Sequence, residues 1–533
     1  MIPLSKTNRY QTAAVIGCGP SGLQAAGELL KQNFKVTIFE RHSQLGGTWC
    51  YDRNNELAEL STIKGVKPFL HEKVSAVYDE LRTNVPFQCM AIGDFPIPQP
   101  EDIRYGHRSE VLAHLQAYAD HLNQMFPTML SYRFNTTIQS VFNDSGWVVV
   151  SETSGKTAEE EFDVVVVATG PFHKPAVTNL HHPEFAGTSF HSMYYDDPSV
   201  LNDRTVLIIG GKNSARDIFW DAMERAKHVV IASPTEQDRN NLVLPEGRFT
   251  NINERFTSIG RVLHIDKDGS VLHSNWDGHE ERFTEQKVDL VIYCTGYKRE
   301  FSFLSEANQP FYVSPNGTEI SNCYLYSAHQ SHPDSLFFFH PIKGRTPFNT
   351  MARDTHAQAR LIAMLAAEKP FSVRQLDNLD QTLQEWLTML FDEWAKETLN
   401  SCPCAAQNPF LMNFFNAVAD YDDHGWFVED PSADILAAVR HRMQELDFRR
   451  INTIWHAGMN LRVRPDGVNW NRFRFLRGRL TSGPNIDDCE LYEVTWFTED
   501  GRYHSSYRED EIKYESLILN DLEHAHPPLE YAY

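Results

Sequence analysis

The chain has 533 residues, of which 41% are hydrophobic and 23% are charged, which is the composition of a multidomain globular protein and excludes a largely disordered or collagen-like chain. Its 71 Asp and Glu against 49 Lys and Arg leave a formal charge of -22. This charge disfavours general binding to nucleic acid or anionic lipid, so small molecules or protein partners are the better expectation.

Eight dispersed cysteines do not form the dense framework of a small secreted domain, which favours a reducing compartment. The first residues lack an apolar signal region, and no run approaches the ~18 apolar residues that cross a bilayer. The sequence therefore predicts a soluble cytoplasmic protein with no membrane association.

The first informative pattern is a predicted strand at 13–16, the glycine-rich turn 17–22 and a helix to about Gln32. A second predicted strand at 35–39 ends in Glu40 and closes a βαβ unit. In this context GxGxxG indicates a dinucleotide site. Its first glycine permits the turn, its second lets the backbone approach a pyrophosphate, and its third lets the helix pack close to the strand. Glu40 is the predicted acceptor for a ribose hydroxyl.

A second unit follows far downstream, with predicted strands at 205–209 and 228–232 around a turn at 210–215 and a helix. Lys212 and Ala215 stand where the fingerprint has its second and third glycines, so this motif alone is weak, and a plain strand–helix turn explains it equally well. Two such units nevertheless suggest an electron relay, with one dinucleotide held permanently and the other arriving as a reductant.

Buried-strand patterns at 163–170 and 288–297 each predict the end of a nucleotide-binding domain. The predicted fold class is α/β, with two Rossmann-like dinucleotide-binding domains, the second inserted into a discontinuous first, and a small C-terminal α+β appendage. The predicted segments are 1–172 (first domain, first part), 173–300 (inserted domain), 301–429 (first domain, second part, with helices) and 430–533 (appendage).

Further segments resemble the class B flavin-dependent monooxygenases, most closely the flavin-containing monooxygenases. The run Leu45-Gly46-Gly47-Thr48-Trp49 is similar to the family's flavin-side GGxW segment, and residues 78–86 with 94–96 are similar to its LRTN-P and DFP stretch. Residues 185–195 fit FxGxxxHxxxY, and residues 294–297 look like its TGY element. The resemblance covers about residues 10 to 390 and keeps the family's order of motifs.

The resemblance implies that FAD binds in the first domain and that NADPH, with NADH as the alternative, binds in the inserted one. Reduced flavin would then add O2 to form a C4a-hydroperoxyflavin, which oxygenates a nitrogen or sulfur atom of a small-molecule substrate. Tyr195 stands where Baeyer–Villiger relatives usually carry tryptophan, which favours heteroatom oxygenation. The alternatives are Baeyer–Villiger oxygenation of ketones and a two-dinucleotide flavoprotein reductase or NAD(P)H oxidase.

Asn84 matches the family's active-site asparagine, so the resemblance makes it the predicted catalytic hydrogen-bond donor. The residues predicted to bind cofactor are Gly17, Gly19, Pro20, Ser21, Gly22, Glu40, Arg41, Gly47, Thr48, Trp49, Asn84, Gly210, Lys212, Asn213, Ser214, Ala215, Thr295 and Gly296. Lys212, Arg216 and Arg239 remain open as the cation for a 2′-phosphate, and no metal site is predicted.

His191 invites a catalytic role, but the preferred interpretation is structural, as a link between the two dinucleotide domains. The arginine cluster between 462 and 479 is best explained as a solvated or docking strand face. For the appendage, three uses stay open: a cap on the active site, a contact in a homo-oligomer, or a surface for a partner.

Overall fold

The computed structural model describes residues 11–51, 65–66, 75–79, 81–83, 87–90, 92, 95, 102–103, 106–176, 180–233, 256–304, 312–313, 320–321, 327–329, 331–339, 351–367, 475–480, 489–497 and 503–506. Asn84 and Arg239, among the residues singled out from the sequence, lie outside this description.

The first domain is built on a six-stranded sheet in the order β22-β23-β9-β1-β2-β5, in which every neighbouring pair except β22 and β23 is parallel. The strands are β1 (Thr12–Ile16), β2 (Lys35–Phe39), β5 (Leu130–Arg133), β9 (Val164–Val167), β22 (Ala328–His329) and β23 (His332–Phe338). β22 and β23 come from residues far beyond the second unit. This confirms that the first domain is discontinuous.

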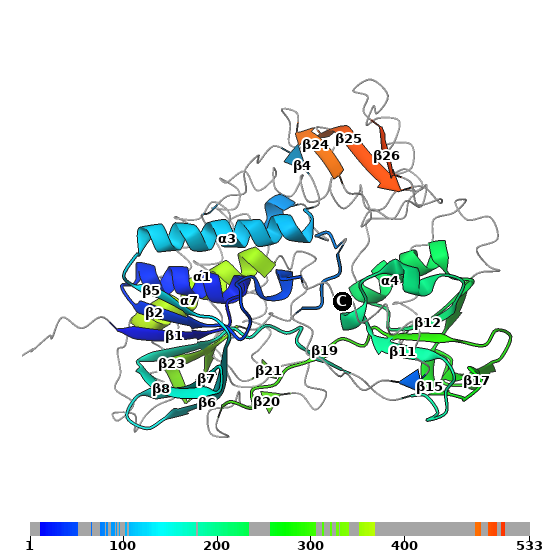
Figure 1. Ribbon diagram of the computed structural model, residues 1–533, viewed down its shortest axis with the longest axis horizontal. Helices are drawn as coiled ribbons and strands as arrows, with labels where there is room; N and C mark the ends of the chain where they lie inside the picture. The colour runs from blue at the N-terminus through cyan, green and yellow to red at the C-terminus, as the bar shows by residue number, and fades with distance from the viewer. Residues whose placement is uncertain are drawn as a thin grey trace, which may run out of the picture.

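Alternate residues of the central strands enter two different cores. Val15 and the side chains on the same face of the sheet pack on the helices α1 (Pro20–Lys31), α3 (Arg108–Met125) and α7 (Met351–Ala367). Ile16 and the side chains on the opposite face pack on the antiparallel sheet of β6 (Thr136–Asn143), β7 (Trp147–Thr153) and β8 (Lys156–Phe162). The parallel sheet is therefore buried on both faces, which is why its strands are continuously apolar (Figure 1).

The second sheet has the order β14-β13-β12-β18-β11-β3, with all its pairs parallel. Its strands are β3 (Gly65–Val66), β11 (Thr188–His191), β12 (Thr205–Ile209), β13 (His228–Ala232), β14 (Phe256–Ile259) and β18 (Leu290–Tyr293). Helix α4 (Asn213–Arg225) covers one face. The antiparallel strands β15 (Arg261–Ile265), β16 (Val271–Ser274) and β17 (Glu280–Phe283) cover the other. The edge strand β3 precedes the predicted boundary at 173.

Two short strands carry the chain between the domains. β10 (Lys174–Pro175) leaves the first domain, β19 (Tyr297–Lys298) returns to it, and the two pair antiparallel. An ion pair between Lys174 and Glu300 joins the same two linkers. Because the linkers are paired, the outgoing and returning chain form one ribbon between the two sheets (Figure 1).

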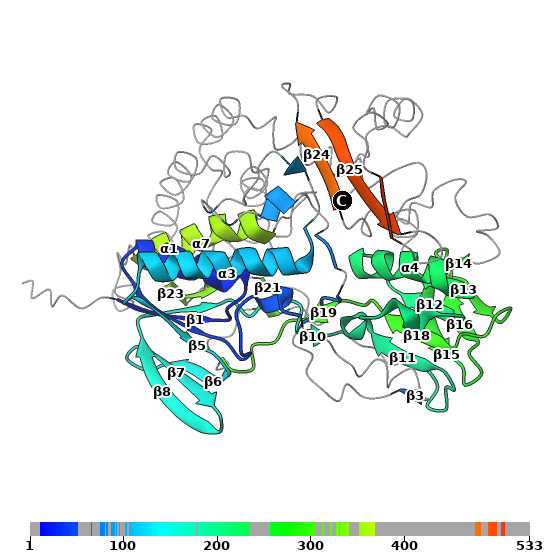
Figure 2. The same ribbon diagram turned by 45° about the horizontal axis from the view of Figure 1, so that its top comes forward.

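The C-terminal segment contributes β24 (Phe475–Leu480), β25 (Cys489–Phe497) and β26 (Tyr503–Ser506), of which β25 and β26 form the expected hairpin. β24 also pairs with β4 (Asp102–Ile103), so the appendage is joined through its backbone to the first part of the chain. In both views this sheet lies above α3 and α4 (Figure 2).

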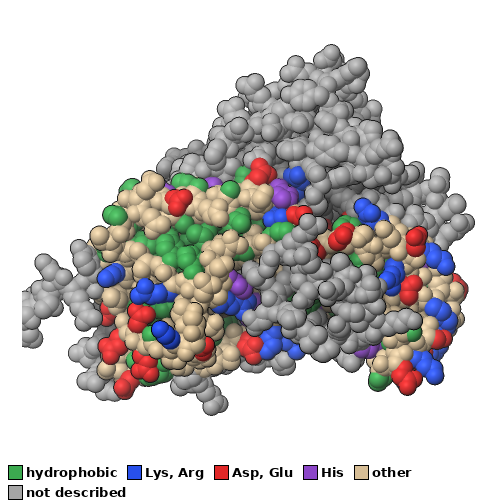
Figure 3. Space-filling model, viewed as in Figure 1, with side chains coloured by type: hydrophobic (Ala, Val, Ile, Leu, Met, Phe, Trp, Pro, Cys, Tyr) green, Lys and Arg blue, Asp and Glu red, His purple; other side chains and the backbone are tan. Residues whose placement is uncertain are grey.

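The remaining elements are β20 (Tyr312–Val313), β21 (Ile320–Ser321) and the 3-10 turns η1 (Gly47–Trp49), η2 (Phe87–Met90), η3 (Ser192–Tyr194) and η4 (Pro198–Leu201). At the β15 and β17 end, acidic and basic side chains are interspersed (Figure 3), with Arg282 paired to Asp266 and Lys287 to Asp268. Across the described ranges, no helix combines the length and the apolar character that a membrane crossing requires.

Candidate functional site

The first glycine-rich turn lies at the carboxyl edge of β1 and leads into α1. Gly17 has a φ of +107°, and a Cβ on it would lie 2.5 Å from the carbonyl oxygen of Ala168. A Cβ on Gly22 would lie 1.9 Å from the carbonyl oxygen of Gly17. Both glycines are therefore required by the protein's own backbone, which is the geometry of a dinucleotide-binding turn.

Gly19 differs from these two because the protein itself leaves room beside it. A Cβ there would meet the Cα of Gly47 at 3.4 Å, an ordinary contact. Gly19 is also the N-cap residue of α1, Pro20 follows as the first helical residue, and no side chain caps this helix end. An uncapped helix N-terminus beside a bare backbone suits a pyrophosphate, so these residues fit FAD.

The turn that contains Gly47, Thr48 and Trp49 is folded against the first glycine-rich turn. The amide of Gly46 donates to the carbonyl of Cys18 at 2.9 Å, and a Cβ on Gly47 would lie 2.7 Å from the Cα of Gly19. The structure thus brings together two segments that the sequence linked only by resemblance. Trp49 is buried in the core between the first sheet and the helices α1, α3 and α7.

Glu40 is buried at the end of β2, and both its carboxylate oxygens accept backbone amides. Oε2 accepts from Cys18 at 2.8 Å and Oε1 from His42 at 2.9 Å. Glu40 therefore ties the end of β2 to the glycine-rich turn, and each oxygen keeps a second lone pair for a further donor. Arg41, the next residue, is exposed.

Two thiols flank the same turn. Cys18 and Cys50 are both buried, and burial is the main reason why the pKa of Cys18 is raised and that of Cys50 is raised to about 12. Such thiols stay protonated at neutral pH, unlike the low-pKa cysteines of disulfide oxidoreductases. This chemistry speaks against a thiol relay through these two residues.

The second turn follows β12 in the same way. Gly210 has a φ of +135°, and a Cβ on it would lie 2.4 Å from the carbonyl oxygen of Cys294. Lys212 is the N-cap residue of α4, and no side chain caps the helix. Lys212, Asn213 and Ser214 are exposed, whereas Ala215 is buried in the core beneath α4. The exposed residues are thus free to meet a ligand that arrives from solvent.

His191 occupies a structural position. Its Nδ1 accepts from the amide of Met193 at 3.1 Å, which leaves Nε2 to donate to the carbonyl of Gly296 at 3.0 Å. Burial lowers the pKa of His191 to about 4, so the ring is neutral at physiological pH. The same carbonyl accepts the amide of Ala176 at 2.9 Å, and Thr295 donates its hydroxyl to the carbonyl of Ala176. His191, Thr295 and Gly296 therefore anchor the linker ribbon.

The stretch before Asn84 is held by the start of α3. Thr83 is buried, its amide donates to the carbonyl of Gly106 at 2.8 Å, and its hydroxyl accepts the amide of Gly106 at 3.0 Å. The amide of Arg108 donates to the carbonyl of Leu81 at 2.9 Å. Asn84 itself lies outside the described residues, so its role stays a prediction.

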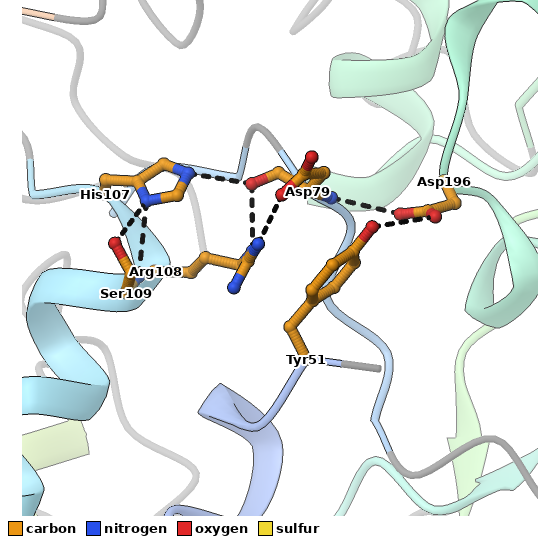
Figure 4. A network of polar contacts seen from close by, with 6 residues as sticks. All are labelled: Tyr51, Asp79, His107, Arg108, Ser109 and Asp196. Carbon is orange, nitrogen blue, oxygen red and sulfur yellow. Dashed lines mark hydrogen bonds and ion pairs between the residues drawn. The ribbon is translucent and has the colours of Figure 1, made fainter. Parts of the chain in front are cut away.

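A polar network that the sequence did not indicate joins the two domains (Figure 4). Tyr51 donates its hydroxyl to Asp196 at 3.0 Å, and the amide of Asp79 donates to the same carboxylate at 3.1 Å. Arg108 pairs with the carboxylate of Asp79, and its guanidinium lies 3.7 Å above the ring of Tyr51. His107 caps α3 through its Nδ1. The signal in the sequence was limited to position: Asp79 lies within the family-like segment 78–86, and Tyr51 and Asp196 follow the segments 45–49 and 185–195.

Tyr195, used above to favour heteroatom oxygenation, is buried and donates its hydroxyl to Asp221 on α4. Its ring packs edge to face on Tyr78, with ring centres 5.8 Å apart. Its position at the end of the signature is therefore explained by packing between the inserted domain and residues 75–79.

Two parallel sheets, each with a glycine-rich turn at its carboxyl edge and joined by paired linkers, define the class of two-dinucleotide flavoprotein oxidoreductases. The family described as flavin-binding monooxygenase-like matches residues 10–247. The flavin-containing monooxygenase FMO GS-OX1 of Arabidopsis thaliana is 34% identical over 337 residues, which are 61% of this chain and 68% of that protein. The chain therefore belongs to the flavin-containing monooxygenase family.

A second relative, FMO GS-OX5 of Arabidopsis thaliana, is 35% identical over 315 residues, 57% of this chain and 64% of that protein. The chain thus spans about two thirds of the length of these relatives. Among solved structures, the S-allyl-L-cysteine S-oxygenase of Allium sativum has a TM-score of 0.54 at 24% identity and covers 82% of this chain and 99% of its own. Tmm of Pelagibacter sp. has a TM-score of 0.52 at 18% identity, with coverage of 83% and 91%. Both support the fold.

Proposed function

We propose that this protein is an FAD- and NADPH-dependent monooxygenase that oxygenates the sulfur atom of a small thioether or thiol. One observation carries the proposal: two uncapped helix N-termini, those of α1 and α4, stand at the carboxyl edges of two equivalent sheets. Such ends bind pyrophosphates, so the chain has one site for each dinucleotide.

Bound FAD would supply the redox chemistry, accepting a hydride from the nicotinamide and activating O2. The reaction balances as sulfide, O2, NADPH and a proton giving sulfoxide, water and NADP+. The chain's own residues bind and orient the two dinucleotides, and no general base in the protein is needed, because the sulfur lone pair is the nucleophile. His191 is accounted for without a catalytic role, since both of its ring nitrogens are bound to backbone groups of Met193 and Gly296.

The preference for sulfur rests on the relatives. The structural neighbour from Allium sativum is named an S-oxygenase of S-allyl-L-cysteine. At 24% identity that likeness shows the fold, and the activity assay below tests the substrate. Nitrogen nucleophiles are the second class to include in such a test.

The preference for NADPH rests on equivalent positions in the two sheets. The amide of Glu40 donates to the carbonyl of Arg133 at the end of β5, and the amide of Ser233 donates to the carbonyl of Ile259 at the end of β14. Ser233 therefore replaces the carboxylate that would accept the 2′-hydroxyl of NADH and repel a 2′-phosphate. The exposed Lys212 adds positive charge nearby.

The test is aerobic NADPH consumption by the purified flavoprotein with thioethers, thiols, amines and ketones, with product mass measured. A gain of one oxygen on the thioethers supports the proposal. Ester formation from ketones would assign the Baeyer–Villiger alternative, and stoichiometric peroxide with every compound would assign an NADPH oxidase. The proposed donor Asn84 is tested in the same assay, because Asn84→Asp should keep NADPH consumption and replace oxygenated product by hydrogen peroxide.

A further inference from the structure

Contacts between tyrosine and aspartate side chains span the two nucleotide-binding domains. Tyr51, two residues after Trp49, donates to Asp196, which directly follows η3 and Tyr195 in the inserted domain. Tyr78 donates its hydroxyl to Asp217 on α4 at 3.0 Å. Each contact joins residues more than a hundred positions apart, and each pairs a phenol of the first part of the chain with a carboxylate of the inserted domain.

Asp196 is buried at this interface, with 8% of its surface exposed. Its two oxygens accept from two donors of the first part of the chain, the hydroxyl of Tyr51 and the amide of Asp79. Burial and the hydrogen bond to Asp196 raise the pKa of Tyr51, so the phenol remains a donor. Arg108 holds both of these partners, since it pairs with Asp79 and stacks on Tyr51 (Figure 4).

A continuous series of contacts runs through Asp196 from the N-terminus of α1 to Asp221, in the C-terminal half of α4. Gly19 at the start of α1 lies against Gly47, and the chain then passes through η1 to Tyr51. Tyr51 binds Asp196, whose neighbour Tyr195 binds Asp221 on α4. The two helices whose N-termini form the proposed dinucleotide sites are therefore connected by close-packed backbone and two phenol–carboxylate hydrogen bonds.

We infer that Asp196 is a positioning residue that fixes helix α4, and with it the turn at its start, relative to the N-terminus of α1, through its contacts with Tyr51 and the amide of Asp79. This inference rests on the proposed function, because its consequence for turnover is the approach of the nicotinamide to the flavin. The linker ribbon joins the domains through β10 and β19, and Asp196 adds an attachment made by the hydroxyl of Tyr51 and the amide of Asp79, beside the Tyr78–Asp217 hydrogen bond.

Hydride transfer needs reacting atoms about 3–3.5 Å apart, and a misplacement of about 1 Å can cost on the order of 100-fold in rate. A residue that sets domain spacing therefore acts on the rate of flavin reduction at saturating coenzyme. It does not act on coenzyme affinity, because Asp196 lies outside both glycine-rich turns. A lower rate of flavin reduction with an unchanged affinity for the coenzyme therefore distinguishes a positioning role from a binding role.

The experiment compares Asp196→Asn and Tyr51→Phe with the control Asp197→Asn. Asp196→Asn replaces one carboxylate oxygen by an amide NH2 group, which then faces another hydrogen-bond donor. Tyr51→Phe deletes the hydroxyl and keeps the ring under Arg108. Asp197 is the exposed neighbour whose carboxylate accepts the amide of Ser199 at 2.8 Å, and asparagine can replace it in that cap. Both charge-changing variants thus remove one negative charge from adjacent positions.

Two readouts are measured. Anaerobic stopped-flow gives the rate of flavin reduction at saturating NADPH and the Kd for NADPH. Distance measurements between spin labels introduced at the exposed Glu159 on β8 and Glu280 on β17 give the spacing of the two domains without any turnover.

We expect Asp196→Asn and Tyr51→Phe to lower the saturating reduction rate by about 10- to 100-fold, to leave the Kd for NADPH within about 3-fold, and to broaden the distance distribution. Asp197→Asn should match the parent protein in all three. A wild-type rate and a wild-type distribution in Asp196→Asn would overturn the inference, as would a loss confined to the Kd. If the parent flavin is not reduced by NADPH, the proposed function fails, and the distance distribution alone still decides the role of Asp196.

Discussion

The two glycine-rich turns occupy equivalent places in their sheets, because the four strands β9-β1-β2-β5 of the first correspond to β18-β12-β13-β14 of the second. The amide of Gly17 donates to the carbonyl of Phe39 at 2.8 Å, and that of Gly210 donates to the carbonyl of Ala232 at 2.9 Å. A second backbone hydrogen bond of 2.8 Å lies on the other side of each turn. The amide of Ala168, after β9, donates to the carbonyl of Ile16, and the amide of Cys294, after β18, donates to the carbonyl of Ile209. The backbone of the two units is thus built alike.

Their side chains differ where a ligand would lie. The first unit has Gly19 and Gly22 at the second and third fingerprint positions, and the second has an exposed Lys212 and a buried Ala215. Only the first glycine is common to both, because in each unit a Cβ there would strike a strand carbonyl. The comparison shows that the apparently weak second fingerprint keeps the first glycine, which both folds require. The first unit also requires Gly22 for its own backbone, and it adds Gly19, which leaves room for a permanently held dinucleotide.

The largest effect is expected at the third position. Gly22→Ala would place a Cβ 1.9 Å from the carbonyl oxygen of Gly17, and overpacking of this kind costs about 1–3 kcal/mol or more. The variant should lose flavin and most soluble yield. The reverse change in the other unit, Ala215→Gly, should cost only about 1 kcal/mol. Flavin absorbance per protein and thermal midpoints of both variants test this, and equal losses would refute the difference between the units.

At the second position, Gly19→Ala should keep the fold and lose the cofactor. The new methyl would be in ordinary contact with Gly47 at 3.4 Å but would stand where the backbone meets the pyrophosphate. We expect about a 5- to 150-fold drop in flavin affinity, since a misfit of one methyl in a close backbone contact costs about 1–3 kcal/mol. Gly146→Ala, where the nearest atom to a Cβ is 3.8 Å away, is the control. Normal flavin occupancy in Gly19→Ala would reject the FAD assignment.

The first unit also has a buried ionic link that secures α1 to α7. Glu28 accepts from His356 at 3.0 Å and from Lys31 at 2.8 Å. Burial raises the pKa of Glu28, but the hydrogen bonds and charges of His356 and Lys31 outweigh burial and lower it to about 2. A depressed carboxyl pKa stabilises the folded state above its normal pKa, and this contribution, up to about 3 kcal/mol, disappears as the pH falls from about 4.5 toward 2.

Glu28→Gln should therefore lower the thermal midpoint for flavin release by several degrees at neutral pH, since 1 kcal/mol corresponds to roughly 2–4 °C in a domain of this size. The difference in thermal midpoint between the variant and the parent protein should become smaller below about pH 4.5. Midpoints followed by flavin fluorescence from about pH 3 to 8 provide the measurement, since the contribution is lost between about pH 4.5 and 2. A gap that is constant at every pH would show that the ionisation of Glu28 does not contribute.

The smallest effect is expected at Lys212. Lys212→Ala should raise the KM for NADPH by about 3- to 10-fold, because one exposed charge contact with the coenzyme is lost. The variant should keep the kcat and the flavin content of the parent protein. Lys227→Ala, an exposed lysine just beyond the other end of α4, is the control. An increase for NADPH alone would assign Lys212 to the 2′-phosphate, and an equal increase for NADH would assign it to the pyrophosphate. An unchanged KM for both would exclude Lys212 from coenzyme binding.

Local patterns in the sequence were sufficient for the two βαβ units. A turn between a buried strand and a helix depends on residues within about thirty positions, so strands 13–16 and 205–209, their helices and the insertion of one domain into the other were predicted correctly. The hairpin of β25 and β26 was predicted for the same reason. Motif order identified the family, and the comparisons confirm it.

Contacts between distant residues were decided by the tertiary structure. Asp196 and Tyr51 are 145 positions apart in the sequence, and Glu28 and His356 are 328 positions apart. Strand β24, near the end of the chain, pairs with β4 in its first part. No periodicity or propensity pairs such residues, because each alone is an ordinary polar or strand-forming residue. Their significance arises only when packing removes water and leaves each buried donor or acceptor with one available partner.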